Sequence, residues 1–76
     1  MATFTVQQGK RYRATITLGW IERLAGNETI AEKLRAAGFS EVSVSGSGGT
    51  RVAEALWSGP DLTGDMPAQV TQVIEI

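Results

Sequence analysis

The stretch GSGG, residues 46–49, is the first place in this chain where residue types and spacing suggest chemistry. Glycines in such a run let backbone N–H groups converge on a phosphate when they stand directly before a helix. Here TRVAEALW follows, but no lysine comes after the last glycine and the spacing is not G-x-G-x-x-G. A glycine-rich link between two alternating runs is more typical of a β-hairpin. The sequence therefore predicts a hairpin bend and no phosphate site.

Acidic side chains are the next candidates for chemistry. Asp61, Thr63 and Asp65 in DLTGD are oxygen ligands of the kind Ca²⁺ prefers, but the spacing and final glutamate of an EF-hand are missing. Aspartates in such a loop more often form Asx turns. Glu54, or Asp61 with Asp65, would serve an enzyme as acid and base only if two carboxylates converged in a pocket. The chain has no cysteine and no histidine, so we expect no catalytic residue, no metal, no cofactor and no enzyme.

Cations and aromatic side chains suggest binding rather than catalysis. Arg11 and Arg13 flank Tyr12 in KRYR, a mixture found in nucleic-acid and glycan binders. Alternation along a strand places Tyr12 on the opposite face from the two arginines, which favours a core role for the tyrosine. A ligand site would need Arg51 to point the same way as Arg11 and Arg13. Both tryptophans are expected in the core, and Trp57, beside a long loop, is the better interface candidate.

Charge is divided unevenly along the chain. The first 39 residues hold six basic and three acidic side chains, whereas the rest hold one basic and five acidic side chains. Such asymmetry favours attraction between copies, so self-association or a protein partner is expected ahead of nucleic acid or glycan. No apolar run is long enough to span a bilayer, and the start MATFTVQQGKRYR has no signal-peptide core. We expect the protein in the cytoplasm or in an assembled particle.

The pattern of apolar residues predicts strands, one helix and a loop. A period of two is clearest over residues 11–18, and a helical period over residues 28–37 is followed by Gly38 as a left-handed cap and preceded by Asn27 as N-cap. Phe39 is expected to pack back on the helix. The remaining predictions are strands over 3–6, 40–46, 50–57 and 70–76, a helical turn over 20–25 and a loop over 58–67. In the last strand, Val70, Ile74 and Ile76 are expected on one face.

These elements predict a single α+β domain over residues 1–76. We expect an antiparallel four- or five-stranded sheet with one main helix on one face, a split βαββ(α)β, ferredoxin-like arrangement whose second helix is reduced to the loop. The strand, the helix ending in AAGF and the following hairpin are similar in arrangement to small bacterial domains such as the SPOR peptidoglycan-binding domain. The internal quasi-repeat and Gly-Pro-Phe strand of that family are missing.

Three functions follow as hypotheses. The first is a small non-catalytic interaction or self-assembly module, such as a bacterial or phage structural or accessory protein, that pairs through an exposed sheet edge or face. The second is a binding domain for glycan or single-stranded nucleic acid, with Arg11, Arg13 and Arg51 on the open face of the sheet. The third is an enzyme that uses carboxylates. The first is preferred because the chain is small, unevenly charged and lacks the usual catalytic residues.

Overall fold

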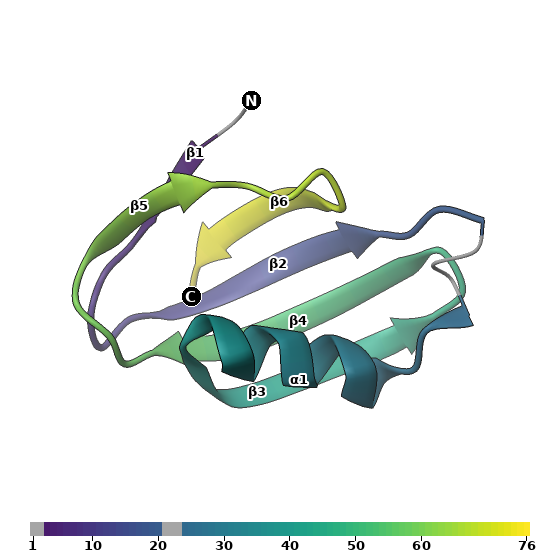
Figure 1. Ribbon diagram of the computed structural model, residues 1–76, viewed down its shortest axis with the longest axis horizontal. Helices are drawn as coiled ribbons and strands as arrows, with labels where there is room; N and C mark the ends of the chain where they lie inside the picture. Colours follow the sequence, from purple (N-terminus) through teal and green to yellow (C-terminus); the bar gives the residue numbers. More distant parts are fainter. Residues whose placement is uncertain (1–2, 21–23) are drawn as a thin grey trace.

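Six strands and one helix are formed by the part of the chain that the computed structural model describes, residues 3–20 and 24–76 (Figure 1). In chain order they are β1 Thr3–Val6, β2 Arg11–Thr17, α1 Asn27–Ala37, β3 Phe39–Ser47, β4 Thr50–Trp57, β5 Leu62–Asp65 and β6 Val70–Glu75. The predicted helix and the predicted strands at both ends of the chain are confirmed within one or two residues. Part of the helical turn expected over residues 20–25 lies outside the described residues.

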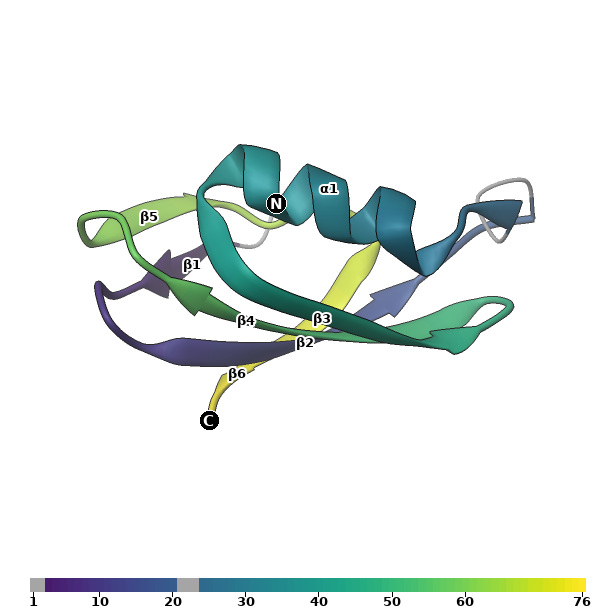
Figure 2. The ribbon, with the colours of Figure 1, turned by 90° about the horizontal axis from the view of Figure 1, so that it is seen from below.

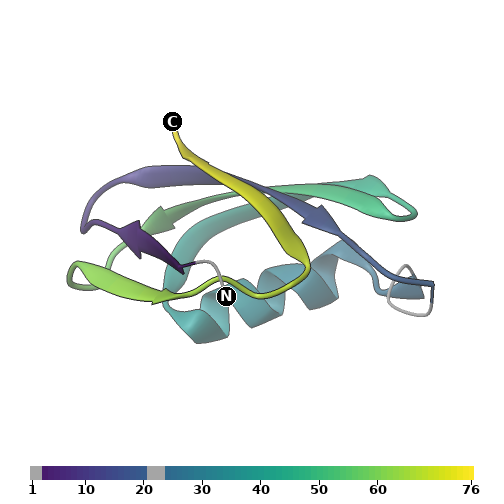
Figure 3. The same cartoon turned by 90° about the horizontal axis from the view of Figure 1, so that it is seen from above.

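The strands form two antiparallel sheets. One has the order β3-β4-β2-β6, and the other is a two-stranded ribbon of β1 and β5. In the larger sheet β4 lies between β2 and β3, the two strands that precede and follow α1. The helix and the β1–β5 ribbon lie on the same side of this sheet, and no described helix or strand covers its other face (Figures 2 and 3). The expected α+β architecture with antiparallel strands and one helix is confirmed, whereas a single ferredoxin-like sheet is not observed.

The two ends of α1 are set by glycines. Gly26 is the N-cap and makes no side-chain capping bond, so the expectation that Asn27 caps the helix is wrong. At the other end Gly38 has φ 117°, and its backbone N–H donates to the carbonyl oxygens of Arg35 and Leu34. That left-handed conformation is accessible to glycine at little cost. A Cβ at this position would also lie 2.9 Å from the Trp57 ring, so the end of the helix rests directly on the core.

The GSGG stretch is a hairpin bend, as predicted. Ser47 pairs with Thr50, which leaves Gly48 and Gly49 as the two-residue connection between β3 and β4. Gly48 has φ 68° and Gly46 has φ 97°, both conformations that side chains disfavour. In β4, Arg51, Ala53, Ala55 and Trp57 alternate as the buried residues.

Two predictions about the last third of the chain are wrong. The loop expected over residues 58–67 contains β5, which pairs with β1 and joins Thr63 to Thr5 by a 2.7 Å hydroxyl contact. In β6, Ile16 pairs with Val70 but Thr15 pairs with Gln72, so the strand carries one extra residue there. This bulge inverts the alternation beyond it. Val73 therefore faces the helix side opposite Ala14, while Ile74 lies on the open face opposite Arg13.

Among the described residues the core forms two clusters. The first is formed by Val6, Tyr12 and Trp57, and the second by Ile16, Ile30 and Ala53. Phe39 packs against the first cluster and meets Trp57 edge to face at 4.9 Å between ring centroids. The Trp57 indole N–H donates to the Pro60 carbonyl at 2.7 Å, which satisfies its one polar group inside the core. Within the described residues no helix is long and apolar enough to cross a membrane.

Candidate interaction site

The three arginines of the predicted ligand site do not lie together. Arg11 and Arg13 are on the open face of the sheet, opposite Leu56 and Glu54 of β4. Arg51 pairs with Ile16 on the other face and is only 5% exposed. Its guanidinium donates to the Asn27 side-chain oxygen at 2.7 Å and to the Gly48 carbonyl at 3.2 Å. Arg51 is therefore part of the support that holds the start of α1 against the β3–β4 hairpin.

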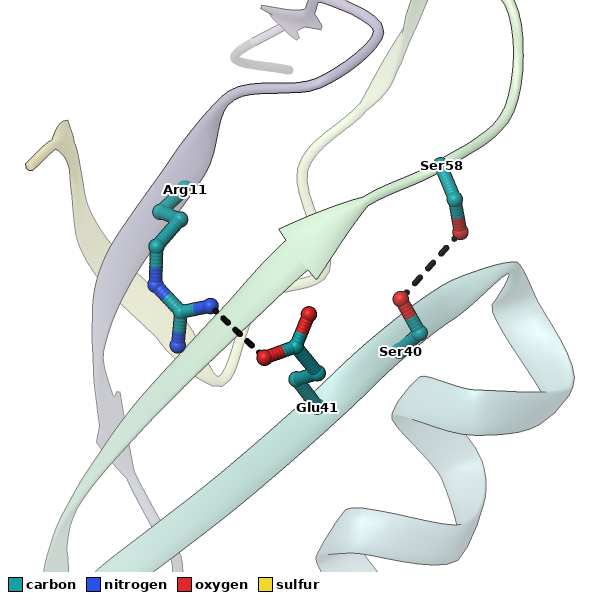
Figure 4. A network of polar contacts seen from close by, with 4 residues as sticks. All are labelled: Arg11, Ser40, Glu41 and Ser58. Carbon is teal, nitrogen blue, oxygen red and sulfur yellow. Dashed lines mark hydrogen bonds and ion pairs between the residues drawn. The ribbon is translucent and has the colours of Figure 1, made fainter.

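The two arginines on the open face are matched by acids. Arg13 Nε lies 2.8 Å from the Glu54 carboxylate, and an Arg11 nitrogen lies 3.5 Å from that of Glu41 (Figure 4). Phosphate binding needs cations that are not already neutralised. Glycan binding in turn relies on aromatic faces, yet Tyr12 lies on the helix side and its hydroxyl accepts from the Gln7 N–H at 2.7 Å. Both arginines of the open face are thus in ion pairs, and Tyr12 is on the other side of the sheet.

Of the two tryptophans, only Trp57 lies in the core as expected. Trp57 is 6% exposed and belongs to the core, so it offers no surface for an interface in this chain. Trp20 is 81% exposed, and the expectation that it is buried is wrong. Leu24 is 83% exposed as well. The sequence pattern does not distinguish the two tryptophans, because each stands within two residues of a glycine at the end of an element.

The carboxylates proposed for Ca²⁺ or for acid–base chemistry are separated. Asp61 accepts the backbone N–H of Gln8 at 2.8 Å, and Glu54 is engaged by Arg13 on the open face. Asp61 thus connects the β1–β2 turn with the segment before β5. Across residues 3–20 and 24–76, no three or more acidic side chains are grouped in a way that would hold a metal ion.

The β3 edge of the larger sheet is interrupted at two points. Its register with β4 shifts between Ser40 and Ser43, and Glu41 in this bulge has φ 50°. Further along, the Asn27 side-chain amide donates to the Gly46 carbonyl at 3.1 Å. Bulges and covering groups are the usual means by which proteins prevent an edge strand from pairing with another chain.

The β6 edge carries a bulge of its own at Thr71, but beyond it, from Gln72 onward, the strand pairs regularly with β2. The Ile76 N–H donates to the Arg11 carbonyl at 2.9 Å, so the backbone of residue 76, and by alternation that of Ile74, points toward β2. The N–H and C=O groups of Val73 and Glu75 consequently point away from the sheet. No described strand pairs with them.

The side chains of β6 suit an apolar contact at that edge. Ile74 is 42% exposed and Ile76 is 46% exposed, and both lie on the open face. The sequence of β6, VTQVIE, contains no lysine and no proline, the residues that most often discourage edge pairing. Sequence reasoning missed this site because the bulge at Thr71, which turns the isoleucines outward, leaves no mark in the apolar pattern.

No family model matches this chain. Searches of curated proteins and of solved structures also return no match. The function is therefore inferred from the residues of the chain itself, and the free edge of β6 is the feature with the clearest chemical meaning.

Proposed function

We propose that this protein is a small non-catalytic self-assembly module that pairs the β6 edges of two copies. The observation that carries the proposal is the outward-facing backbone of Val73 and Glu75, which offers two N–H and two C=O groups in one row. A second strand laid along this row satisfies all four groups and extends the four-stranded sheet across the contact.

A second copy fits this edge because β6 is complementary to itself. Two antiparallel β6 strands related by a two-fold axis give an isologous contact, the commonest type in homo-oligomers. With Ile74 on the axis, Ile74 faces Ile74 of the second copy, and Val73 lies opposite Glu75 of that copy. A register centred on Glu75 would oppose two carboxylates directly and is disfavoured. The Ile74 register is therefore the one we propose.

Other edges fit a second copy less well. The β3 edge is bent at Glu41 and covered at Gly46, as described above. The β1–β5 ribbon consists of strands of four residues each, and very short edge strands give little pairing. Binding of glycan or nucleic acid on the open face has no comparable support, because Arg11 and Arg13 are paired with acids and Arg51 lies on the other face.

Light scattering over a concentration series tests the proposal. The unmodified chain is expected to reach the mass of a dimer, and Glu75→Pro, which removes an outward N–H, is expected to remain a monomer. Glu75→Gln is the matched control, since it removes the charge but keeps the N–H and should still dimerise. A monomer at every concentration for the unmodified chain would contradict self-assembly.

Cysteine cross-linking tests the register, because the chain has no cysteine of its own. Ile74 occupies a non-hydrogen-bonded position with respect to the second copy, where Cα atoms are about 4.5 Å apart and a disulfide can close. Ile74→Cys should therefore form a covalent dimer on oxidation, whereas Gln72→Cys should not. A dimer that forms without the Ile74→Cys cross-link would reject this register and leave self-assembly in place.

A further inference from the structure

A pocket of about 400 Å³ lies between one flank of α1, the end of β2 and the start of β6. Its apolar walls are formed by Ile16, Leu18, Ile30, Leu34 and Val70. Pockets that bind small molecules usually measure about 300–1,000 Å³ and are lined mostly by apolar side chains. The size and the lining of this pocket are therefore those of a small-molecule site.

The sheet register directs these apolar side chains into the pocket. Ile16 pairs with Val70, so both side chains lie on the helix side of the sheet. Ile16 and Ile30 are buried members of the second core cluster. The residues that pack against this cluster at the pocket are Leu18, Leu34 and Val70. These three remain half-buried because the pocket is open to the surface, and an apolar ligand would remove their exposed carbon from water.

The pocket exists because α1 lies toward one side of the sheet. The helix crosses over β3 and β4 (Figures 1 and 2), and the side-chain amide of Asn27 donates to the Gly46 carbonyl on the β3 edge. The second core cluster is therefore less covered toward β2 and β6, and the pocket occupies the space beside the helix there.

A cationic side chain lies at the rim of this pocket. Lys33 is exposed and lines the pocket together with Thr29, which stands four residues earlier on the same flank of α1. Among the described residues Lys33 takes part in no ion pair, whereas Arg35 on the other flank is paired with Glu28 at 2.8 Å. No acidic residue stands three or four positions from Lys33 along the helix, and none is among the described residues that line the pocket. The Lys33 ammonium is thus available to a ligand, while its methylene stem can lie along the apolar wall.

We propose that this pocket binds a monocarboxylic acid with an apolar chain, of the medium-chain fatty acid class. The chain lies on the apolar walls, and the carboxylate lies at the rim, where its two oxygens accept from the Lys33 ammonium and the Thr29 hydroxyl. A head group with one negative charge matches the single cation of the rim. The inference is independent of the pairing of β6, because the outward groups of Val73 and Glu75 take no part in this pocket.

The test uses the full chain with isotope-labelled leucine and valine methyl groups, titrated with octanoate, octylamine, octanol and butyrate. Octanoate is expected to shift the signals of Leu18, Leu34 and Val70 and to leave that of Leu56, on the open face, unchanged. Octylamine has the same chain and the opposite charge and should bind less tightly. Butyrate should bind about tenfold to a hundredfold less tightly, because each CH₂ group buried against the walls contributes about a fourfold factor.

Two lysine variants measure the contribution of the charge at the rim. Lys33→Gln should weaken octanoate about two- to fivefold, the effect of one exposed charge, and leave octanol unchanged. Lys10 lies in the turn before β2, away from the pocket. Lys10→Gln is therefore the matched control, since it makes the same change in net charge and should leave octanoate binding unchanged.

Two further variants measure the contribution of the walls. Val70→Phe places a larger side chain in the pocket and should weaken octanoate about tenfold, the effect of displacing about two CH₂ groups from the walls. Val52→Phe makes the same change on the open face, opposite Thr15, and is the matched control. Ala25→Leu narrows the pocket from another side and replaces Val70→Phe if that variant does not fold.

The proposal is overturned if octanoate leaves the methyl signals of the pocket in place, or if octylamine binds as tightly as octanoate. Equal weakening by Lys33→Gln and Lys10→Gln would also overturn it, because the charge would then act at long range and not at the rim. The same holds if the pocket signals of the ligand-free chain change with protein concentration, since a second copy would then occupy the pocket.

Discussion

The two edge strands of the larger sheet, β3 and β6, differ in how their outward backbone groups are treated. On β3 a bulge with Glu41 at φ 50° interrupts the row, and the Asn27 amide occupies the Gly46 carbonyl at 3.1 Å. On β6 the outward groups of Val73 and Glu75 meet no described partner strand. The β3 edge is interrupted at two points, whereas β6, beyond its own bulge at Thr71, presents the outward groups of Val73 and Glu75 next to exposed isoleucines.

The position of the helix explains this difference. α1 crosses over β3 and β4, so its first residue reaches the β3 edge near the hairpin (Figures 1 and 2). β6 lies at the far side of the sheet, beyond β2, where the helix does not extend. The helix therefore supplies a capping group to the β3 edge but not to the β6 edge. The unprotected edge is then the natural place for a partner strand, as natural sheets otherwise avoid leaving such edges open.

The largest expected effect comes from proline at two neighbouring positions of β6. Ile74→Pro removes an N–H that points toward β2 and should lower the free energy of unfolding by about 2–4 kcal/mol. Glu75→Pro removes an N–H that points outward and should cost the monomer less than about 1 kcal/mol. Urea unfolding of both variants, at a concentration where they are monomeric, gives the comparison. Equal losses would mean that the assigned directions of the β6 backbone groups are wrong.

Asn27 offers a test of the closed edge. Asn27→Ala removes both the acceptor for buried Arg51 and the donor to the Gly46 carbonyl, and should lower the free energy of unfolding by about 1–3 kcal/mol. Asn27→Asp keeps the acceptor and loses only the donor, so its cost should stay below about 1 kcal/mol. Thermal or chemical unfolding of the two variants separates these roles. An Asn27→Asp loss as large as that of Asn27→Ala would show that the bond to Gly46 dominates.

Most elements of this fold could be predicted from the local pattern, because residues close together in the sequence determine whether each segment becomes a strand, a helix or a turn. The period of two over residues 11–18 and the glycines of the hairpin are signals of this kind. β5 could not be found in the same way. Leu62–Asp65 contains glycine and aspartate and becomes a strand only through pairing with β1, almost sixty residues earlier in the chain. Long-range pairing of this type overrides local propensity.

The candidate site was harder to predict than the fold. An arginine is normally expected at the surface, but Arg51 is buried because Asn27 and the Gly48 carbonyl accept its hydrogens. A bulge of one residue at Thr71 determines which side chains of β6, among them Ile74, lie on the open face. A shift of one residue exchanges the two faces of a strand, so an error in register moves every later side chain to the wrong side.

The smallest expected effect concerns the bulge that closes β3. Glu41 has φ 50°, a conformation that costs most residues about 1 kcal/mol or more and glycine almost nothing. Its ion pair with Arg11 is 3.5 Å long and joins side chains that are 66% and 40% exposed, so it contributes little. Glu41→Gly should therefore raise the free energy of unfolding by about 0.5–1 kcal/mol, despite the greater chain entropy of glycine in the unfolded state.

Glu41→Gln is the matched control for this change, since it removes the charge and keeps the Cβ. It should alter the free energy of unfolding by less than about 0.5 kcal/mol in urea experiments. If Glu41→Gly were the less stable of the two, the bulge would hold no strain that glycine relieves. Neither variant restores a regular β3 edge, because the extra residue between Ser40 and Ser43 stays in place. Association through β6 should accordingly be the same in both variants as in the unmodified chain.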